Sequence, residues 1–307
     1  MAGEPIVTSI APSAAKGDRF AAFALLSDYW ALTKPEVNFL IVISTFAGFY
    51  LGREDAGRQF SFVALFHTLV GTLLVASGTA TLNQYIERSF DAQMRRTARR
   101  PCAAGRLEPC AVLAFGIVLS VAGGIYLAVA ASVLASLLAL LTLLSYLFLY
   151  TPLKRRTPLC VLVGAVPGAM PPLIGWAAAS GKLNLEAWLL YAILFFWQFP
   201  HFMAIAWMYR EDYDRAGYLI LPKGHARVRI VALQTILPLV VLVVISILKY
   251  PIEYPSVLLW AGLMLALGFF YLGLEFVLCR SRATARRLLA ASIVYLPLVL
   301  ALRVTFL

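Results

Sequence analysis

Nine apolar segments, each of about 20 residues, constrain the fold of this 307-residue chain more than any other sequence feature. A segment of this length spans a bilayer core as a helix, because lipid offers no partners to a backbone outside helices or closed barrels. The alternation typical of barrel strands is absent. We therefore predict an all-α integral membrane protein with nine transmembrane helices. The segments lie at about 31–52, 60–82, 110–129, 132–150, 159–179, 186–208, 229–248, 256–278 and 287–306.

The first 28 residues differ from the rest of the chain. The opening stretch MAGEPIVTSIAPSAAKGDRF lacks a charged start, a compact apolar core and a cleavage site, so it is not expected to be a signal peptide. We interpret residues 1–28 as a cytoplasmic tail that is disordered or lies on the membrane surface. Residues 29–307 are interpreted as a single transmembrane domain.

The basic residues are distributed unevenly between the two sides of the predicted membrane domain. Of the 26 Lys and Arg residues, 21 fall in the N-terminal region up to Lys34 and in the loops after the second, fourth, sixth and eighth segments. The positive-inside rule places these regions in the cytoplasm and the C-terminus outside. The net charge of +11 is thereby explained by topology, and no nucleic-acid partner is expected. The five remaining basic residues are Arg53, Arg58, Lys182, Lys249 and Arg303.

The four cysteines show no pattern typical of a metal site. Cys102, Cys110, Cys160 and Cys279 form neither a CxxC pair nor a Cys/His pair at ligand spacing. We therefore expect neither zinc nor disulfides.

Two of the cytoplasmic loops carry acids and bases together. One begins at Asn83 with NQYIERSFDAQMRRTARRP, and the other begins at Tyr209 with YREDYDRAGYLILP. They lie four helices apart and so emerge on the same face. This spacing indicates two four-helix halves followed by a ninth helix, an arrangement that usually places the site between the halves.

Three side chains in the first loop region recur every four residues. On a helix, Asn83, Glu87 and Asp91 line one face. Amide and carboxylate oxygens are hard ligands that suit Mg²⁺. The alternative is a solvated juxtamembrane segment whose arginines serve topology and lipid headgroups. That alternative explains Asn83 and Glu87 poorly, because polar groups at membrane depth are costly.

Basic side chains adjoin these ligands and suit a phosphate group. The arginine guanidinium can bind phosphate through two parallel hydrogen bonds. Four arginines follow the Asn83, Glu87 and Asp91 series directly: Arg95, Arg96, Arg99 and Arg100. Magnesium ligands beside arginines predict a diphosphate site, and its position beside an apolar bundle predicts an isoprenyl diphosphate. Two further groups could complete this site or be ordinary loop charges. They are Glu211, Asp212 and Asp214 with Arg210 and Arg215, and Lys154, Arg155 and Arg156.

Four blocks of the sequence resemble the UbiA superfamily of intramembrane prenyltransferases, and specifically its haem-farnesylating branch. The blocks cover roughly residues 30–230, and PPLIGW and WQFPHF are typical of that branch. They read NQYIERSFDAQMRRTARRPCAAGRL, YTPLKRRTP, VGAVPGAMPPLIGW (163–176) and WQFPHFMAIAWMYREDYDRAGYLILP (197–222).

This resemblance implies a reaction. Farnesyl diphosphate loses diphosphate with help from Mg²⁺, the farnesyl carbon joins a vinyl group of haem b (protohaem IX), and water adds to give haem O for terminal oxidases. Carried over by position, Asn83, Glu87 and Asp91 would hold Mg²⁺, the one cofactor. The other candidate site residues are Glu211 and Asp212 as catalytic carboxylates, Arg96, Arg100 and Lys154 on diphosphate, and Arg155, Arg210, Tyr150 and His201 in substrate binding.

The resemblance also implies a location and partners. The protein would be a multi-pass protein of the bacterial cytoplasmic (inner) membrane, surrounded by lipid. A haem A synthase or a terminal oxidase assembly factor could associate with it.

The second loop departs from the wider superfamily. That superfamily carries a second DxxxDxxxG motif, whose two aspartates correspond here to Tyr209 and Tyr213. The haem branch shares this departure. Whether Glu211 or Asp212 binds metal directly is therefore open, and a second Mg²⁺ is less expected than the first.

Histidines and aromatic residues offer candidates for the acceptor pocket. His201 either forms a hydrogen bond inside the bundle or contacts the porphyrin or its iron. His67 has only a structural interpretation, and His225 could touch propionates. Pro171 and Pro172 should break the fifth helix, which suggests a pocket inside the bundle. The aromatic side chains that could wall a macrocycle, or simply pack, are Trp176, Phe196, Trp197 and Phe202.

Two other functions remain open at this point. A prenyltransferase acting on an aromatic quinone precursor would share the fold, but PPLIGW and WQFPHF argue against it. A transporter would line a path across the bilayer with charge. The acids gather on one face instead, and the outer half is nearly bare.

Overall fold

The computed structural model describes residues 14–222, 224–248 and 256–305, and all the regular elements within these ranges are helices. Nine spans in the described part of the chain are long and apolar enough to cross a membrane, which confirms the predicted fold class. The spans are α2 (Pro35–Asp55), α3 (Phe62–Asp91), α4 (Pro109–Ala130), α5 with η1 and α6 (Val133–Leu144, Ser145–Tyr150 and Thr151–Leu153), α7 with α8 (Cys160–Gly168 and Pro171–Ser180), α9 (Leu185–Met208), α11 (His225–Leu248), α12 (Ser256–Cys279) and α13 (Arg282–Thr305).

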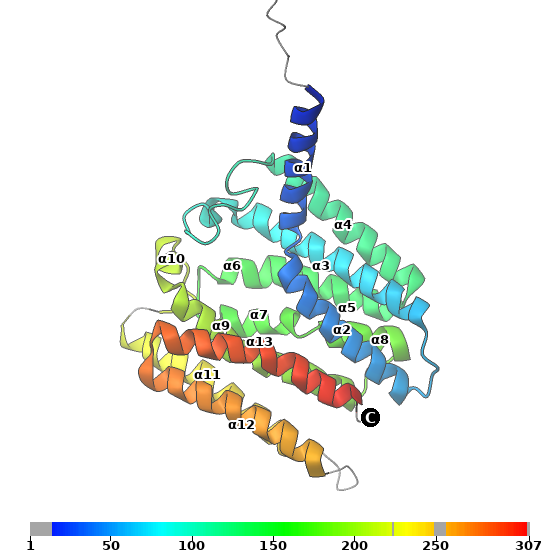
Figure 1. Cartoon of the computed structure of the whole chain (residues 1–307), viewed down its shortest axis with the longest axis vertical. Helices are drawn as coiled ribbons and strands as arrows, with labels where there is room; N and C mark the ends of the chain where they lie inside the picture. Colours follow the sequence, from blue (N-terminus) through cyan, green and yellow to red (C-terminus); the bar gives the residue numbers. More distant parts are fainter. Residues whose placement is uncertain (1–13, 223, 249–255, 306–307) are drawn as a thin grey trace, which may run out of the picture.

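Helices that follow one another in the chain pack side by side (Figure 1). α3 packs against α4 and α4 against α5, while α9, α11, α12 and α13 continue the series in the second half of the chain. α13 then contacts both α9 and α2, and so brings the end of the chain back to the first span. The two halves are joined most closely where α2 lies against α8.

The contact between α2 and α8 depends on glycine. A Cβ atom built at Gly48 would collide with the carbonyl of Pro172, and one built at Gly175 would collide with the carbonyl of Thr45. Small residues let membrane helices approach closely enough for their backbones to touch. The two glycines thus set the distance between α2 and α8.

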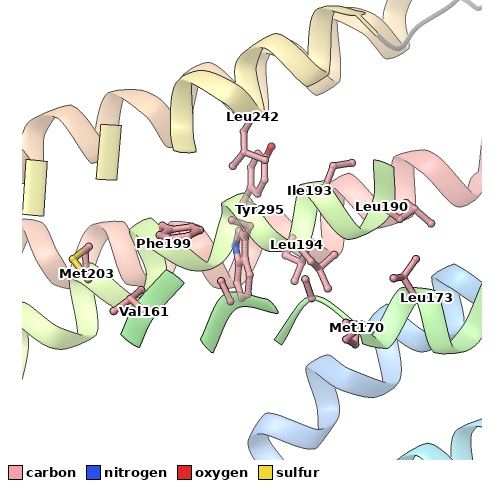
Figure 2. Packing of buried hydrophobic residues seen from close by; sticks show 14 of the residues in the cluster. Val161, Met170, Leu173, Leu190, Ile193, Leu194, Phe199, Met203, Leu242 and Tyr295 are labelled. Carbon is pink, nitrogen blue, oxygen red and sulfur yellow. The ribbon is translucent and has the colours of Figure 1, made fainter. Parts of the chain in front are cut away.

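The main core surrounds α9. Figure 2 shows Leu190, Ile193 and Phe199 of this helix among side chains from four other elements. These partners are Val161 of α7, Met170 and Leu173 near the start of α8, Leu242 of α11 and Tyr295 of α13. All of them belong to one continuous cluster of buried apolar side chains. α9 therefore holds a fixed position from which its later turns can present side chains.

Two of the spans are not continuous α-helices. The fifth span ends its first helix at Gly168 and resumes at Pro171, which confirms the predicted break at Pro171 and Pro172. The fourth span changes to a π-helix, η1, over Ser145–Tyr150. A π turn is rare and is frequently found at functional sites.

The loops that carry the polar motifs lie together at one end of the bundle. In Figure 1 the loop after α3 and the short helix α10 (Arg210–Arg215) both lie at the left, and the end of α13 lies at the opposite end. We call the left end the motif end, defined by residues 83–108, 151–159 and 209–222. α3 continues to Asp91, beyond the predicted limit of residue 82, so the whole polar ladder is helical.

An additional helix precedes the first span. α1 (Ala14–Leu32) projects from the bundle and contacts it mainly through α3 (Figure 1). The boundary placed at residue 28 falls within this helix, and residues 1–13 of the predicted tail lie outside the described residues. The division into tail and domain remains an interpretation.

Candidate active site

The polar ladder of α3 points into the protein rather than toward solvent. Asn83, Glu87 and Asp91 are 1%, 5% and 1% exposed, although they occupy the last three turns of a helix that ends at the motif end. Buried charges need partners, because taking a carboxylate out of water costs on the order of several kcal/mol. The partners of these three side chains define the site.

Glu87 is the centre of the cluster. The Nζ atom of Lys154 donates to both carboxylate oxygens of Glu87, each at 2.9 Å. The hydroxyl of Tyr218 donates to Oε1 at 2.9 Å, and the amide of Asn83 donates to Oε2 at 2.9 Å. Three parts of the chain, α3, the segment after α6 and the segment after α10, therefore meet at one carboxylate.

Asp91 has its own cation one turn further along α3. Nη1 of Arg100 lies 2.7 Å from Oδ2 of Asp91, and the Asp91 side chain is almost completely buried. The hydroxyl of Thr97 donates to the Asp91 backbone carbonyl at 2.9 Å and so folds the following loop back over the helix end. The loop places Arg100 beside the ladder for this reason.

Lys34, the residue before α2, contributes a third cation. Its Nζ donates to Oδ1 of Asn83 at 3.2 Å. Its φ of 52° lies in the left-handed region, which non-glycine residues rarely adopt and which points to a functional constraint. Burial, together with the nearby charges of Arg100 and Lys154, lowers the pKa of Lys34 to about 7. The positive charge of Lys34 is disfavoured by two neighbouring cations, and an anion bound between the three would relieve that repulsion.

Lys154 is held in place by aromatic rings and backbone. Its Nζ lies 4.6 Å from the ring centroid of Tyr150 and 5.8 Å from that of Tyr146. Its carbonyl accepts a hydrogen bond from the backbone of Leu219 at 2.7 Å. Burial opposes its charge, but the Glu87 carboxylate outweighs this and raises the pKa of Lys154 well above its usual value. Lys154 therefore stays positively charged in the site.

The second motif loop meets the first, as the shared face predicted. Oδ2 of Asp212 accepts a hydrogen bond from the backbone N–H of Arg96 at 3.3 Å, and Asp212 is 8% exposed. The Arg96 guanidinium lies 5.0 Å from the ring centroid of Tyr209 and 3.4 Å from the Tyr213 hydroxyl. The two tyrosines that replace the expected aspartates thus contact an arginine. In this state Asp212 binds protein backbone.

Three predicted residues lie at the edge of this cluster. The Glu211 side chain is 78% exposed and has Arg210 as its neighbour at 3.9 Å. Arg210 itself donates to the carbonyl of Trp207 at 3.0 Å. The guanidinium of Arg155 lies over the ring of Phe90 at 4.3 Å. The structure therefore brings Asn83, Glu87, Asp91, Arg100 and Lys154 together, but it does not bring Glu211 to them.

His201 belongs to a second cluster, deeper in the membrane. It stacks on Trp197, with ring centroids 4.8 Å apart, and meets Phe202 edge-on. Its Nδ1 lies 2.8 Å from the hydroxyl of Ser292 on α13. Trp176 is not part of this cluster, because it lines a separate cavity of about 250 Å³ with Leu51 and Arg303 at the other end of the bundle.

The sequence pattern does not identify two residues of the site. In the pattern Lys34 counts only as a topological charge, and Tyr218 carries no signal at all. Lys34 precedes a proline at the start of a helix, and this Lys-Pro step is the one available hint. Tyr218 reaches Glu87 across 131 residues of sequence, a contact that only the folded chain creates.

The donor set of the ladder fits a single Mg²⁺. The ion prefers one or two carboxylates and completes its shell with water and phosphate oxygens. Two buried carboxylates and an amide oxygen meet that requirement. Within the described residues no group of three or more His, Cys, Asp and Glu side chains could hold a metal, so the remaining ligands would come from substrate and water. When Lys34 is protonated, Lys34, Arg100 and Lys154 exceed the two carboxylates by one positive charge, which favours an anion beside the metal.

The chain matches known proteins over nearly its whole length. The model of the UbiA prenyltransferase family matches residues 23–296. A protoheme IX farnesyltransferase of Solibacter usitatus is 46% identical over 281 residues, which cover 89% of this chain and 96% of the relative. A protoheme IX farnesyltransferase of Koribacter versatilis is 40% identical over 286 residues and covers 91% of this chain and 92% of its own.

Solved structures share the fold at low identity. A structure of digeranylgeranylglyceryl phosphate synthase superimposes with a TM-score of 0.70 at 16% identity and covers 92% of this chain and 98% of its own. A UbiA homologue from Archaeoglobus fulgidus, solved with GPP and Mg²⁺, has a TM-score of 0.61 at 14% identity. It covers 88% of this chain and 99% of its own.

Proposed function

Because the chain belongs to the UbiA prenyltransferase family, we propose that it transfers a farnesyl group from farnesyl diphosphate to a vinyl group of haem b, which yields haem O. The observation that carries this proposal is the buried cluster of Glu87 and Asp91 with Lys34, Arg100 and Lys154 at one end of an apolar bundle. The names of its relatives in Solibacter and Koribacter support farnesyl transfer to protoheme IX. The chain is a multi-pass membrane protein.

Asn83, Glu87 and Asp91 would hold Mg²⁺, as their buried oxygens suggest. The Mg²⁺ bound to prenyl diphosphate in the Archaeoglobus homologue supports this assignment. Bound there, the ion would neutralise charge that develops on the departing diphosphate. Asp212 lies next to the same loop through the backbone of Arg96 and could join the site once substrate enters.

The cations would bind the diphosphate and stabilise it as a leaving group. Arg100 offers a fork to phosphate oxygens, while Lys34 and Lys154 act as point charges. These charges already lie in place and act in a site with little water, so they stabilise negative charge more strongly than they would in solution. The Tyr218 hydroxyl keeps Glu87 oriented. Arg96 is exposed and lies beside Tyr213 in the same loop region.

The reaction balances with water as the third reactant. The bond between the farnesyl carbon and the diphosphate oxygen breaks, and the electron pair leaves with diphosphate. The vinyl group supplies the electrons of the new carbon–carbon bond. Water adds to the resulting cation and releases one proton, which leaves a hydroxyl group on the side chain.

The orientation is also a proposal. The excess of Lys and Arg on the motif end supports a cytoplasmic position for it in the bacterial inner membrane, with the C-terminus outside. Farnesyl diphosphate would then enter from the cytoplasm with its tail among the helices. Association with a haem A synthase or an oxidase assembly factor stays a prediction.

Product formation by the purified protein tests the proposal. With farnesyl diphosphate, Mg²⁺ and haem b, we expect a haem product whose mass increases by one farnesyl group and one hydroxyl group. An excess of chelator should abolish its formation. Undiminished turnover in chelator would contradict the metal assignment.

The same assay separates the alternatives. A farnesylated product from 4-hydroxybenzoate, with haem b unchanged, would favour a quinone-precursor prenyltransferase. Substrate flux into liposomes without any new product would favour a transporter. The sequence identity to the protoheme IX farnesyltransferases argues for the haem acceptor.

A further inference from the structure

The second polar cluster, around His201, has a hydrogen-bond pattern that assigns the proton on the histidine ring. Ser292 on α13 is fully buried. Its hydroxyl donates to the Leu289 carbonyl at 2.6 Å, and the same oxygen lies 2.8 Å from Nδ1 of His201. A hydroxyl has one hydrogen and two acceptor positions. With its hydrogen committed to Leu289, Ser292 accepts a hydrogen bond from His201, and the proton is on Nδ1.

The surroundings leave Nε2 as a lone pair. A charged imidazolium at this depth of a membrane helix would be costly, so the ring is neutral. Among the described residues no hydrogen-bond partner faces Nε2. An unmatched N–H at this position would carry a desolvation cost of about 1–3 kcal/mol, which the Nδ1–H form avoids. His201 is also only partly buried, so Nε2 can be approached.

Trp197 fixes the plane of the His201 ring. Its Nε1 donates to the backbone carbonyl of Ser292 at 2.8 Å, and its ring stacks on His201. α9 is thus tied to α13 by two hydrogen bonds to one residue. A histidine that donates through Nδ1 and keeps a free Nε2 on a rigid helix has the arrangement of a metal-ligating histidine.

We propose that Ser292 is a positioning residue that holds His201 in the Nδ1–H form, so that Nε2 ligates the iron of the haem substrate. This inference rests on the proposed function, because haem is the iron-bearing acceptor. His201 lies about two turns, or roughly 11 Å, from the end of α9 that carries Tyr209 and the diphosphate site.

Binding spectra of the full-length protein in lipid nanodiscs test the proposal without farnesyl diphosphate. The probes are haem b and iron-free protoporphyrin IX. We expect ferrous haem b to show an iron–histidine stretching band in its resonance Raman spectrum. In His201→Asn the amide can still donate to Ser292, but Nε2 is gone. The band should disappear and haem b should bind at least about tenfold more weakly, while protoporphyrin IX binds unchanged.

Ser292→Ala tests the positioning role. The iron–histidine band should shift to lower frequency, because Nδ1 loses its hydrogen-bond acceptor, and haem affinity should fall by about tenfold. Ser120→Ala is the matched control, since it removes another buried serine hydroxyl that donates to a helix carbonyl, at Gly116. His67→Asn is the histidine control. Both controls should keep the wild-type spectrum and affinity.

The outcomes separate this inference from the proposed function. If His201→Asn or Ser292→Ala keeps the wild-type band and haem affinity, the assignment of the ligand or of its positioning residue is wrong, even if haem O is formed. A wild-type protein that forms product but shows no iron–histidine band also overturns the inference. A band without any farnesylated haem leaves the ligation standing and overturns the proposed function.

Discussion

At the scale of single residues, the site depends on how each buried carboxylate is matched with a cation. Glu87 pairs with Lys154, and Asp91 pairs with Arg100, so removing one member leaves the other charge buried. Breaking a buried pair in this way typically costs about 3–5 kcal/mol. Substitutions that keep the shape of the side chain are therefore the informative ones.

Asp91→Asn should reduce farnesyl transfer about 100-fold or more, because the amide cannot supply the negative charge that a divalent cation needs. Initial rates at saturating Mg²⁺ measure the change. Asp214→Asn is the control, since Asp214 lies in the second motif loop but pairs with Arg227 at 3.2 Å. Equal rates for Asp91→Asn and the wild type would remove Asp91 from the metal site.

Lys34→Met should raise the KM for farnesyl diphosphate about tenfold, which corresponds to the loss of one hydrogen bond to a charged group. The haem KM should stay constant, because Lys34 contacts Asn83 in the first cluster rather than His201 in the second. Lys182→Met, in an exposed position between α8 and α9, is the control. An equal rise in both KM values would indicate a general structural effect instead.

At the scale of elements, the sequence predicted best what depends on local periodicity. The spacing of Asn83, Glu87 and Asp91 placed them on one helical face, and α3 has that face. The break before Pro171 followed from the chemistry of proline. The contacts of Lys34 and Tyr218 with the ladder could not be predicted, because they join segments 49 and 131 residues apart in the chain. The exposure of Glu211 depends on how α10 turns, which the pattern of loop charges does not specify.

Gly175→Ala should destabilise the protein by about 1–3 kcal/mol, the usual cost of inserting an extra group into a packed interface. The added methyl group would meet the carbonyl of Thr45 and force α8 away from α2. The temperature of half-inactivation in a fixed detergent measures the effect. Gly268→Ala is the control, since an added Cβ there meets nothing within 4 Å. If both variants inactivate at the same temperature, the close approach of α2 and α8 carries no stability.

At the scale of the whole molecule, the nine spans were predictable from composition, because only apolar helices of this length satisfy a bilayer. The packing of the last helix against the first span was not predictable from composition. α13 contacts both α2 and α9, and through Ser292 it also holds His201. The pattern of hydrophobicity predicts the length of each helix but not which helices pack against it. The contacts of α13 could therefore not be derived from that pattern.

The native cysteines allow the proposed orientation to be measured. Cys110 and Cys279 are exposed at helix ends that should face the cytoplasm, whereas Cys102 and Cys160 are buried. A membrane-impermeant maleimide should label the protein in inverted vesicles and leave it unlabelled in right-side-out vesicles. A variant that replaces both exposed cysteines with serine and carries Lys182→Cys should give the reverse pattern. Labelling of the native cysteines from the outside would invert the topology.

The π turn in η1 sets a rule about insertions and deletions. Each residue added to or removed from Ser145–Tyr150 would rotate everything after it by about 100° and swing Lys154 away from Glu87. The side chains in that stretch can vary where they face lipid, as Phe148 does, but the number of residues cannot. Variants of this gene that keep its chemistry should therefore carry substitutions in this stretch but no insertions or deletions.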